Sequence, residues 1–222
     1  MIRSVIFDWN GTLLADTMPA VTAFNKICKK YGKAPITLQR YRHVMDIPVR
    51  QVYLQNGFTE EELKNFGSDF QATFLEHYEP LADKARLRRG ARHTLNWLVN
   101  HGFDVVLISN HVQELIEKQL ARLNIDHFFS HVYGNHEATK ILTSRTKGDK
   151  MIEYIKRKKL SKDEVINVGD APEEIHMARA AGVMSVAITD GFYAAKRLRA
   201  EKPDYMITNM MQLVNIVQRI NS

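Results

Sequence analysis

The sequence predicts an α/β fold, a Rossmann-like doubly wound parallel sheet with a helical cap inserted after the first strand. Three observations lead to this prediction. Short apolar runs alternate with helix-length segments along most of the chain, which is typical of βαβ units. The runs are nearly continuous in Val, Ile and Phe, as expected for strands covered by helices on both faces. Between residues 18 and 85 no comparable run occurs, and the pattern indicates only helices.

The first strand is predicted at residues 3–9, RSVIFDW. A helix is expected within residues 19–32, PAVTAFNKICKKYG, where apolar side chains recur at helical spacing and a glycine ends the stripe. Further strands are expected at 104–110, 164–170, 184–190 and 204–208. Helices are expected at 94–100, at 112–123, at 149–159, and from Pro172, which suits a first turn, to Gly182, which suits a helix end.

This order of elements predicts two structural units. We expect residues 1–17 and 86–222 to form the Rossmann-like core and residues 18–85 to form the helical cap. The inserted segment leaves the sheet after the first strand and returns before the second, so it must lie over the carboxyl ends of the strands. Ligands bind at this edge of open α/β sheets. A site between cap and sheet is therefore expected.

Composition indicates an ordinary globular protein. Hydrophobic residues make up 45% of the 222 residues and charged residues 25%, as in folded domains generally. The chain shows no leader-like start and no apolar run near the ~18 residues of a membrane span. The single cysteine, Cys28, cannot form an internal disulfide, which agrees with a reducing compartment. We therefore expect a cytoplasmic protein without a membrane partner.

The net charge favours an anionic partner. The formal charge is +6, which suits a phosphorylated metabolite, a nucleic acid or a membrane surface equally well. Basic residues are spread over 84–92, 140–159 and 196–202, and no nucleic-acid-binding module or interleaved aromatic set accompanies them. We therefore expect no nucleic acid partner.

Polar residues gather where the predicted elements meet the cap. Asp8 follows the first strand, Ser109 and Asn110 end the second, Lys147 precedes a helix, and Asp170 follows the strand at 164–170. Taken singly, each has an ordinary structural explanation, such as a helix cap or a solvated lysine. Their joint placement is more informative, because a Rossmann-like topology brings these positions together at one edge of the sheet.

The motifs DWNGT (8–12), ISN (108–110), TKGDK (146–150) and GDAPEE (169–174) resemble those of the haloacid dehalogenase superfamily. The resemblance is greatest to phosphoglycolate-phosphatase-like members with a small helical cap, and it extends to LLADT (13–17) and MARAAGV (177–183). It implies a phosphatase acting on a small phosphorylated metabolite. It also implies that Asp8 is the nucleophile that takes the phosphoryl group, and that Lys147, or as the alternative Lys150, is the catalytic lysine.

The resemblance further implies a Mg²⁺ cofactor. Its ligands would be Asp8, Asp170 and the backbone carbonyl of Asn10, with Glu174 contacting a metal-bound water. The chemistry requires such a cation, because an anionic nucleophile attacks an anionic phosphate, and Mg²⁺ prefers oxygen ligands.

The remaining phosphate contacts are implied in the same way. Lys147 would add a positive charge, while the Ser109 hydroxyl and backbone N–H groups beside Gly11 and Asn110 would hold the phosphoryl oxygens. Thr12 would steady the loop that carries these groups. Arg42, His43 and Arg50 of the cap are candidates for meeting a second anionic group of the substrate, although surface charges explain them equally well.

Asn10 departs from the pattern of the superfamily. Phosphatases of that superfamily carry a second aspartate there, which protonates the leaving group and later activates water. A carboxamide does neither, and loss of a general acid–base typically costs ~10²–10⁴-fold in rate. Three interpretations stay open. Asp8 works slowly, or Asp8 is a metal ligand in a catalytically impaired binding or regulatory protein. In the third, Asn10 was engineered in place of an aspartate, or it regenerates a carboxylate by deamidation.

A haloacid dehalogenase, in which the aspartate attacks carbon without a metal, is a further alternative. The acidic residues of GDAPEE argue against it, because Asp170 and Glu174 have no purpose in a metal-free site. The sequence indicates neither the physiological substrate nor the oligomeric state.

Overall fold

The computed structural model describes residues 1–47, 49–136 and 147–222. A six-stranded parallel sheet forms its centre, in the order β3-β2-β1-β4-β5-β6. The strands are β1 (Ser4–Phe7), β2 (Asp104–Val112), β3 (His131–Asn135), β4 (Val165–Gly169), β5 (Met184–Ile188) and β6 (Tyr205–Ile207). The predicted doubly wound α/β fold is confirmed.

Strand β3 was not predicted from the sequence. Its segment, HVYGN, contains one aliphatic residue, and its first three residues are only partly buried. It lies at the edge of the sheet and pairs with β2 alone, so it does not need the continuous apolar character of a central strand.

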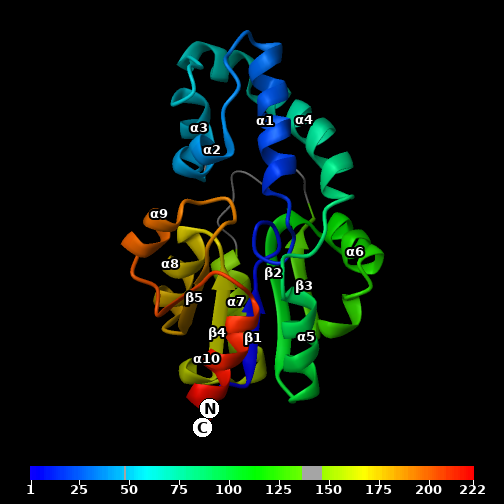
Figure 1. Cartoon of the computed structure of the whole chain (residues 1–222), viewed down its shortest axis with the longest axis vertical. Helices are drawn as coiled ribbons and strands as arrows, with labels where there is room; N and C mark the ends of the chain where they lie inside the picture. Colours follow the sequence, from blue (N-terminus) through cyan, green and yellow to red (C-terminus); the bar gives the residue numbers. More distant parts are fainter. Residues whose placement is uncertain (48, 137–146) are drawn as a thin grey trace.

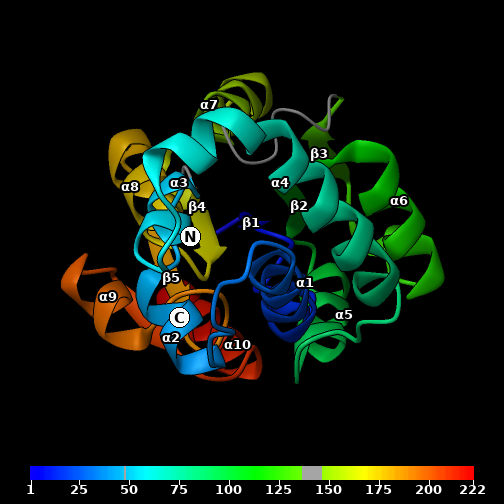
Figure 2. The same ribbon diagram turned by 90° about the horizontal axis from the view of Figure 1, so that it is seen from above.

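Helices cover both faces of the sheet, as Figure 2 shows from above. Helices α5 (Ala91–Asn100) and α10 (Met211–Asn221) share one apolar core with Val5 and Phe7 of β1. Helices α7 (Lys147–Lys158) and α8 (Pro172–Ala181) share another with Ile6, the residue between them. Successive side chains of a strand point to opposite faces, so β1 contributes to both cores.

Two further helices complete the sheet's surroundings, α6 (Gln113–Arg122) and α9 (Ala195–Ala200). The predicted helix starting at Pro172 is confirmed, and Gly182 ends it in the left-handed conformation at φ +71°. The helix predicted at 149–159 begins two residues earlier, which places Lys147 in its first turn. Helices α9 and α10 were not predicted.

The segment between β1 and β2 forms helices α1 (Thr17–Lys30), α2 (Leu38–Val44), α3 (Arg50–Leu54) and α4 (Glu60–Ala82). Figure 1 shows them together beyond the carboxyl ends of the strands. Rings from different helices and connecting loops pack against each other here: the centroids of Tyr31 and Phe70 lie 4.7 Å apart, and those of Tyr53 and Phe58 lie 5.2 Å apart. Thr59 and Glu62 form a capping box that starts α4.

None of the helices in the described part of the chain has both the length and the apolar character that crossing a bilayer requires.

Candidate active site

The loop after β1 is a tight turn that fixes the direction of Asp8. The N–H groups of Thr12, Leu13 and Leu14 all donate to the carbonyl oxygen of Trp9, at 3.3, 3.0 and 3.0 Å. Gly11 adopts φ +71°, and a Cβ atom there would lie 2.5 Å from Asp170 Oδ2. Only glycine combines this backbone conformation with so close an approach.

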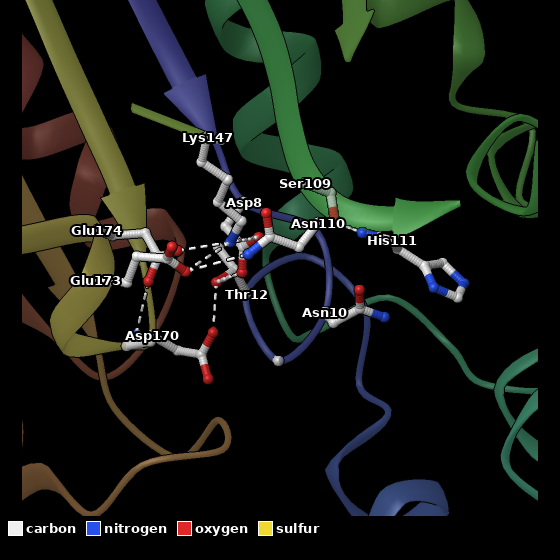
Figure 3. Close-up of polar contacts among 12 residues, drawn as sticks. Asp8, Asn10, Thr12, Ser109, Asn110, His111, Lys147, Asp170, Glu173 and Glu174 are labelled. Atoms are coloured by element: carbon white, nitrogen blue, oxygen red, sulfur yellow. Dashed lines mark hydrogen bonds and ion pairs between the residues drawn. The ribbon is translucent and has the colours of Figure 1, made fainter. Parts of the chain in front are cut away.

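Lys147 forms the central ion pairs of the site. Its Nζ lies 2.7 Å from Asp8 Oδ1 and 2.7 Å from Glu174 Oε1 (Figure 3). Burial disfavours the charge of Lys147, but the charges of Asp8, Glu174 and Glu173 outweigh burial and raise the pKa of Lys147 well above its usual range. The acidic neighbours of Lys147 therefore favour its charged form beside Asp8.

Lys150, the alternative lysine, has other partners. Its Nζ donates to the carbonyl oxygen of Gly134 at 2.7 Å and to Asn135 Oδ1 at 2.9 Å. Of the two lysines, Lys147 is the one that contacts Asp8.

Thr12 connects the two aspartates that follow neighbouring strands. Its hydroxyl lies 2.8 Å from Asp170 Oδ1 and 3.2 Å from Asp8 Oδ2. The other oxygen of Asp170 accepts a hydrogen bond from the N–H of Phe192 at 2.6 Å. Burial, and then the nearby charge of Asp8, raise the pKa of Asp170 to about 7.

Glu174 has partners for both of its oxygens. Oε1 meets Lys147, and Oε2 accepts from the N–H of Ala171 at 3.1 Å. Burial raises the pKa of Glu174, against the opposing charge of Lys147. Its neighbour Glu173, which the sequence reasoning did not single out, lies 3.9 Å from Lys147 and accepts from Asn110 Nδ2 at 3.2 Å.

Ser109 and Asn110 lie near the carboxyl end of β2 and line the same pocket as Asp8. Ser109 Oγ accepts a hydrogen bond from the N–H of His111 at 3.1 Å, which leaves its own hydrogen to be donated. Asn110 Oδ1 and Glu173 Oε1 are buried polar atoms that have no hydrogen-bond partner among the residues the structure describes. Such atoms are uncommon in folded proteins and often mark a place where a ligand binds.

The side chain of Asn10 is held by two groups that the sequence reasoning missed. Asn10 Nδ2 donates to Asp16 Oδ2 and to the hydroxyl of Tyr78, both at 2.8 Å. The Tyr78 hydroxyl itself donates to Asp16, and Gly11 N–H donates to the other Asp16 oxygen at 2.7 Å. The N–H of Gly11 is therefore bonded to Asp16, whereas the resemblance implied that N–H groups beside Gly11 contact the phosphate.

Asp16 is a fully enclosed carboxyl group. Burial raises the pKa of Asp16 to about 6, although hydrogen bonds from Tyr78 and Asn10 lower it. LLADT (13–17) entered the sequence reasoning only as part of the resemblance to the superfamily. Nothing in this short segment indicated that the Asp16 carboxylate accepts a hydrogen bond from Asn10.

The three cap residues expected near the substrate lie elsewhere. Arg42 Nε donates to the carbonyl oxygen of Gly191 at 2.9 Å, Arg50 pairs with Glu60, and His43 is exposed. None of the three lines the pocket above Asp8. A recognition role for them stays a prediction.

The pocket itself has two chemically different ends. The core end is formed by Asp8, Lys147, Asp170 and their polar neighbours, while the cap end is formed by aromatic and aliphatic side chains. Among the latter are Phe24, Tyr41, Val52, Tyr53, Phe74 and Tyr78.

The oxygen atoms at the core end fit a hard divalent cation. Asp8 and Asp170 are two carboxylates on either side of one hydroxyl, and burial, followed by repulsion from the charge of Asp8, raises the pKa of Asp170. A cation that prefers oxygen ligands would relieve this repulsion. Within the described residues, no group of three or more His, Cys, Asp or Glu side chains forms a complete metal site. Backbone oxygen and water would therefore have to complete the coordination.

Comparison with known proteins places this geometry in context. Residues 5–188 match the model of a family described as haloacid dehalogenase-like hydrolase. The chain is 24% identical over 222 residues to a Caldanaerobacter subterraneus protein provisionally named pyrophosphatase PpaX, covering 98% of this chain and 95% of the relative. It is 24% identical over 217 residues to a phosphoglycolate phosphatase of Pseudomonas putida, covering 96% of this chain and 78% of the relative.

A solved structure of a haloacid dehalogenase-like family hydrolase from Streptococcus pneumoniae has the same fold. The TM-score is 0.81 at 20% identity, with 97% of this chain and 98% of the other covered.

Proposed function

Because the chain belongs to the haloacid dehalogenase-like hydrolase family, we propose that it hydrolyses phosphomonoesters of small metabolites, with Asp8 as nucleophile and Mg²⁺ as cofactor. The observation that carries the proposal is the position of the Asp8 carboxylate. One of its oxygens lies 2.7 Å from the Lys147 ammonium, and the other faces Thr12 and, beyond it, Asp170. Similarity to the phosphoglycolate phosphatase of Pseudomonas putida supports a phosphate ester as substrate.

In this proposal an Asp8 oxygen attacks phosphorus, and the bond between phosphorus and the ester oxygen breaks. The ester oxygen leaves with the electron pair and takes a proton from water, because Asn10 offers no acidic proton. Water then attacks the phosphorus of the aspartyl-phosphate, the bond between phosphorus and the Asp8 oxygen breaks, and a proton of the attacking water neutralises the hydroxide left by the first step. Phosphate is released and the Asp8 carboxylate is restored.

The surrounding residues hold the phosphoryl oxygens. Lys147 offsets their negative charge, and the Ser109 hydroxyl and Asn110 amide offer hydrogen bonds from the end of β2. Asp8, Asp170 and the backbone carbonyl of Asn10 would hold Mg²⁺, with Glu174 reaching it through water. When bound, the ion supplies positive charge against the phosphoryl oxygens.

The cap completes the proposed enzyme. We propose residues 18–85 as the cap and residues 1–17 and 86–222 as the catalytic core. Each of the helices α1–α4 contributes side chains to the lining of the pocket, which supports this division. A closed cap would exclude water from the phosphoryl group.

The test is hydrolysis of p-nitrophenyl phosphate with Mg²⁺ by the natural sequence and by Asp8→Asn. This aryl ester needs little protonation of its leaving group, so the absence of an acid at position 10 matters least. Asp8→Asn should abolish turnover, while Asp126→Asn, at an exposed aspartate in the turn before β3, should keep it. Equal activity of Asp8→Asn and the natural sequence would refute Asp8 as nucleophile.

A catalytically impaired phosphate-binding protein is the second candidate. It is favoured by Asn10, whose amide is already committed to Asp16 and Tyr78. Calorimetry that finds Mg²⁺-dependent binding of inorganic phosphate, together with no turnover of the aryl ester, would support this candidate over the first.

A further inference from the structure

Resting on the proposed function, we infer that the substrate carries an uncharged, mainly apolar leaving group, an aryl group above all, in place of a second anionic group. The inference depends on the lining of the pocket, on the positions of the cations around it, and on the chemistry of Asn10.

The cap end of the pocket offers apolar surface directly above the phosphate end. Phe74 comes from α4, Val52 and Tyr53 come from α3, and Phe192 comes from the loop after β5. Phe74 and Phe192 are only partly buried although both line the pocket. Their rings are therefore available to a ligand, and aromatic faces bind apolar and aromatic groups well.

The cations near the pocket are already engaged. Among the lining residues that the structure describes, Lys147 is the sole lysine or arginine, and its ammonium lies at the phosphate end between Asp8 and Glu174. Arg88 donates to the carbonyl oxygens of Gly11 and Thr189, both at 2.6 Å, and does not line the pocket.

The cap arginines provide no substitute. Arg42 is bound to the core loop at Asp190 and Gly191, and Arg50 is paired with Glu60. With the cations of the described residues alone, a carboxylate on the leaving group would thus be buried against aromatic rings without a charge partner, which is strongly unfavourable. Phosphoglycolate has such a carboxylate, so its fit to this pocket is poor.

The chemistry of Asn10 independently favours an aryl leaving group. Without an acid at position 10, the leaving oxygen must depart with its negative charge. Phenolate is a much weaker base than an alkoxide, so a phenol ester needs proton donation far less. The apolar rings and the missing acid both select an aryl ester.

The test compares two phosphonates that share a head group and resist hydrolysis. Benzylphosphonate carries an apolar ring and phosphonoacetate carries a carboxylate, and calorimetry with Mg²⁺ measures both dissociation constants. We expect benzylphosphonate to bind at least ~10-fold more tightly, since burying a ring is worth about that factor or more.

Two variants test whether the pocket lining causes the preference for benzylphosphonate over phosphonoacetate. Phe74→Ala should reduce the ratio of the two affinities by several-fold, about the effect of losing one aromatic contact. Leu81→Ala changes an exposed residue of the same helix outside the pocket and should leave the ratio as it is. Equal or tighter binding of phosphonoacetate would overturn the inference, as would failure of both phosphonates to bind.

A kinetic comparison separates this inference from the proposed function. We expect kcat/KM for phenyl phosphate to exceed that for 2-phosphoglycolate by ~10²-fold or more, since ring burial and leaving-group ability act together. The opposite preference would overturn the inference and leave the phosphatase proposal standing. Benzylphosphonate binding without turnover of either ester would overturn the phosphatase proposal and still support the pocket's preference.

Discussion

The ammonium of Lys147 lies 2.7 Å from the carboxylate of Asp8, and both side chains are only 7% exposed. A buried ion pair of this kind costs desolvation on both sides, and loss of one member leaves the other uncompensated. The proposed nucleophile is thus paired with a cation that comes from the other half of the chain.

Replacing Lys147 with methionine should impair both folding and catalysis. Asp8 and Glu174 would be left buried without their cation, at a cost of about 3–5 kcal/mol, and kcat should fall by ~10²–10³-fold. Urea unfolding and p-nitrophenyl phosphate kinetics measure the two effects. Lys150→Met is the matched comparison, and a larger rate loss for that variant would reverse the assignment of the two lysines.

The Asn10→Asp exchange should have an effect that depends on Asp16. The new carboxylate would lie beside Asp16 Oδ2, which is now 2.8 Å from the Asn10 amide, so the single variant should be less stable through like-charge repulsion. The double variant Asn10→Asp with Asp16→Asn restores an amide opposite a carboxylate. It should be more stable than the single variant, and urea unfolding would show whether it is.

The variants that carry Asn10→Asp should also turn over faster than the natural sequence. A general acid–base is worth ~10²–10⁴-fold, and the gain should be larger for an alkyl phosphate than for p-nitrophenyl phosphate, because the alkoxide needs the proton more. An equal gain on both esters, or none, would count against Asn10 as the cause of slow turnover.

Replacing Gly11 with alanine should disrupt the loop beyond the usual cost of a left-handed residue. The added Cβ would lie 2.4 Å from a ring atom of Phe192 and 2.5 Å from Asp170 Oδ2. Gly32→Ala is a suitable control, because Gly32 has a similar φ of +65° but nothing within 4 Å of the added atom. The control should lose about 1 kcal/mol. Gly11→Ala should lose more stability and its Mg²⁺ affinity, and equal losses would mean that the close approach is unimportant.

Glu79 and His111 should give the unfolding free energy a measurable pH dependence. Burial, and then the charge of Asp83, raise the pKa of Glu79 from 4.5 to about 7. Folded Glu79 then holds a proton that the unfolded chain has lost, so its stabilising contribution falls as the pH rises from about 4.5 to about 7. Glu79→Gln should remove this slope in urea unfolding experiments.

His111 contributes the opposite slope over part of the same range. Burial lowers the pKa of His111 from 6.5 to about 4, so its contribution is present above pH 6.5 and is lost as the pH falls toward 4. His111→Gln serves as the paired control. If Glu79→Gln and His111→Gln change the slope in the same direction, this account of the pair is wrong.

The central sheet could be predicted because buried parallel strands require near-continuous apolar residues, as SVIF of β1 shows. Strand β3 could not, since an edge strand tolerates His, Gly and Asn. Asp8, Ser109 and Asp170 could be placed together because topology alone brings strand ends to one edge.

The contact between Asp16 and Tyr78 could not be predicted, for a different reason. Their hydrogen bond joins residues 62 positions apart, and its formation depends on how α4 packs over the loop after β1. Local periodicity carries no information about such a contact, although it does indicate that each segment is helical or turned.

The hydroxyl of Tyr78 belongs to α4 of the proposed cap, whereas Asn10 and Asp16 belong to the loop beside the proposed nucleophile. Any motion that lifts α4 from the sheet must break both of these hydrogen bonds and admit water to Asp16. The loop would then regain its two hydrogen bonds with Tyr78 only when α4 docks again, so that each opening and closing of the proposed cap would expose and re-enclose the Asp16 carboxyl group.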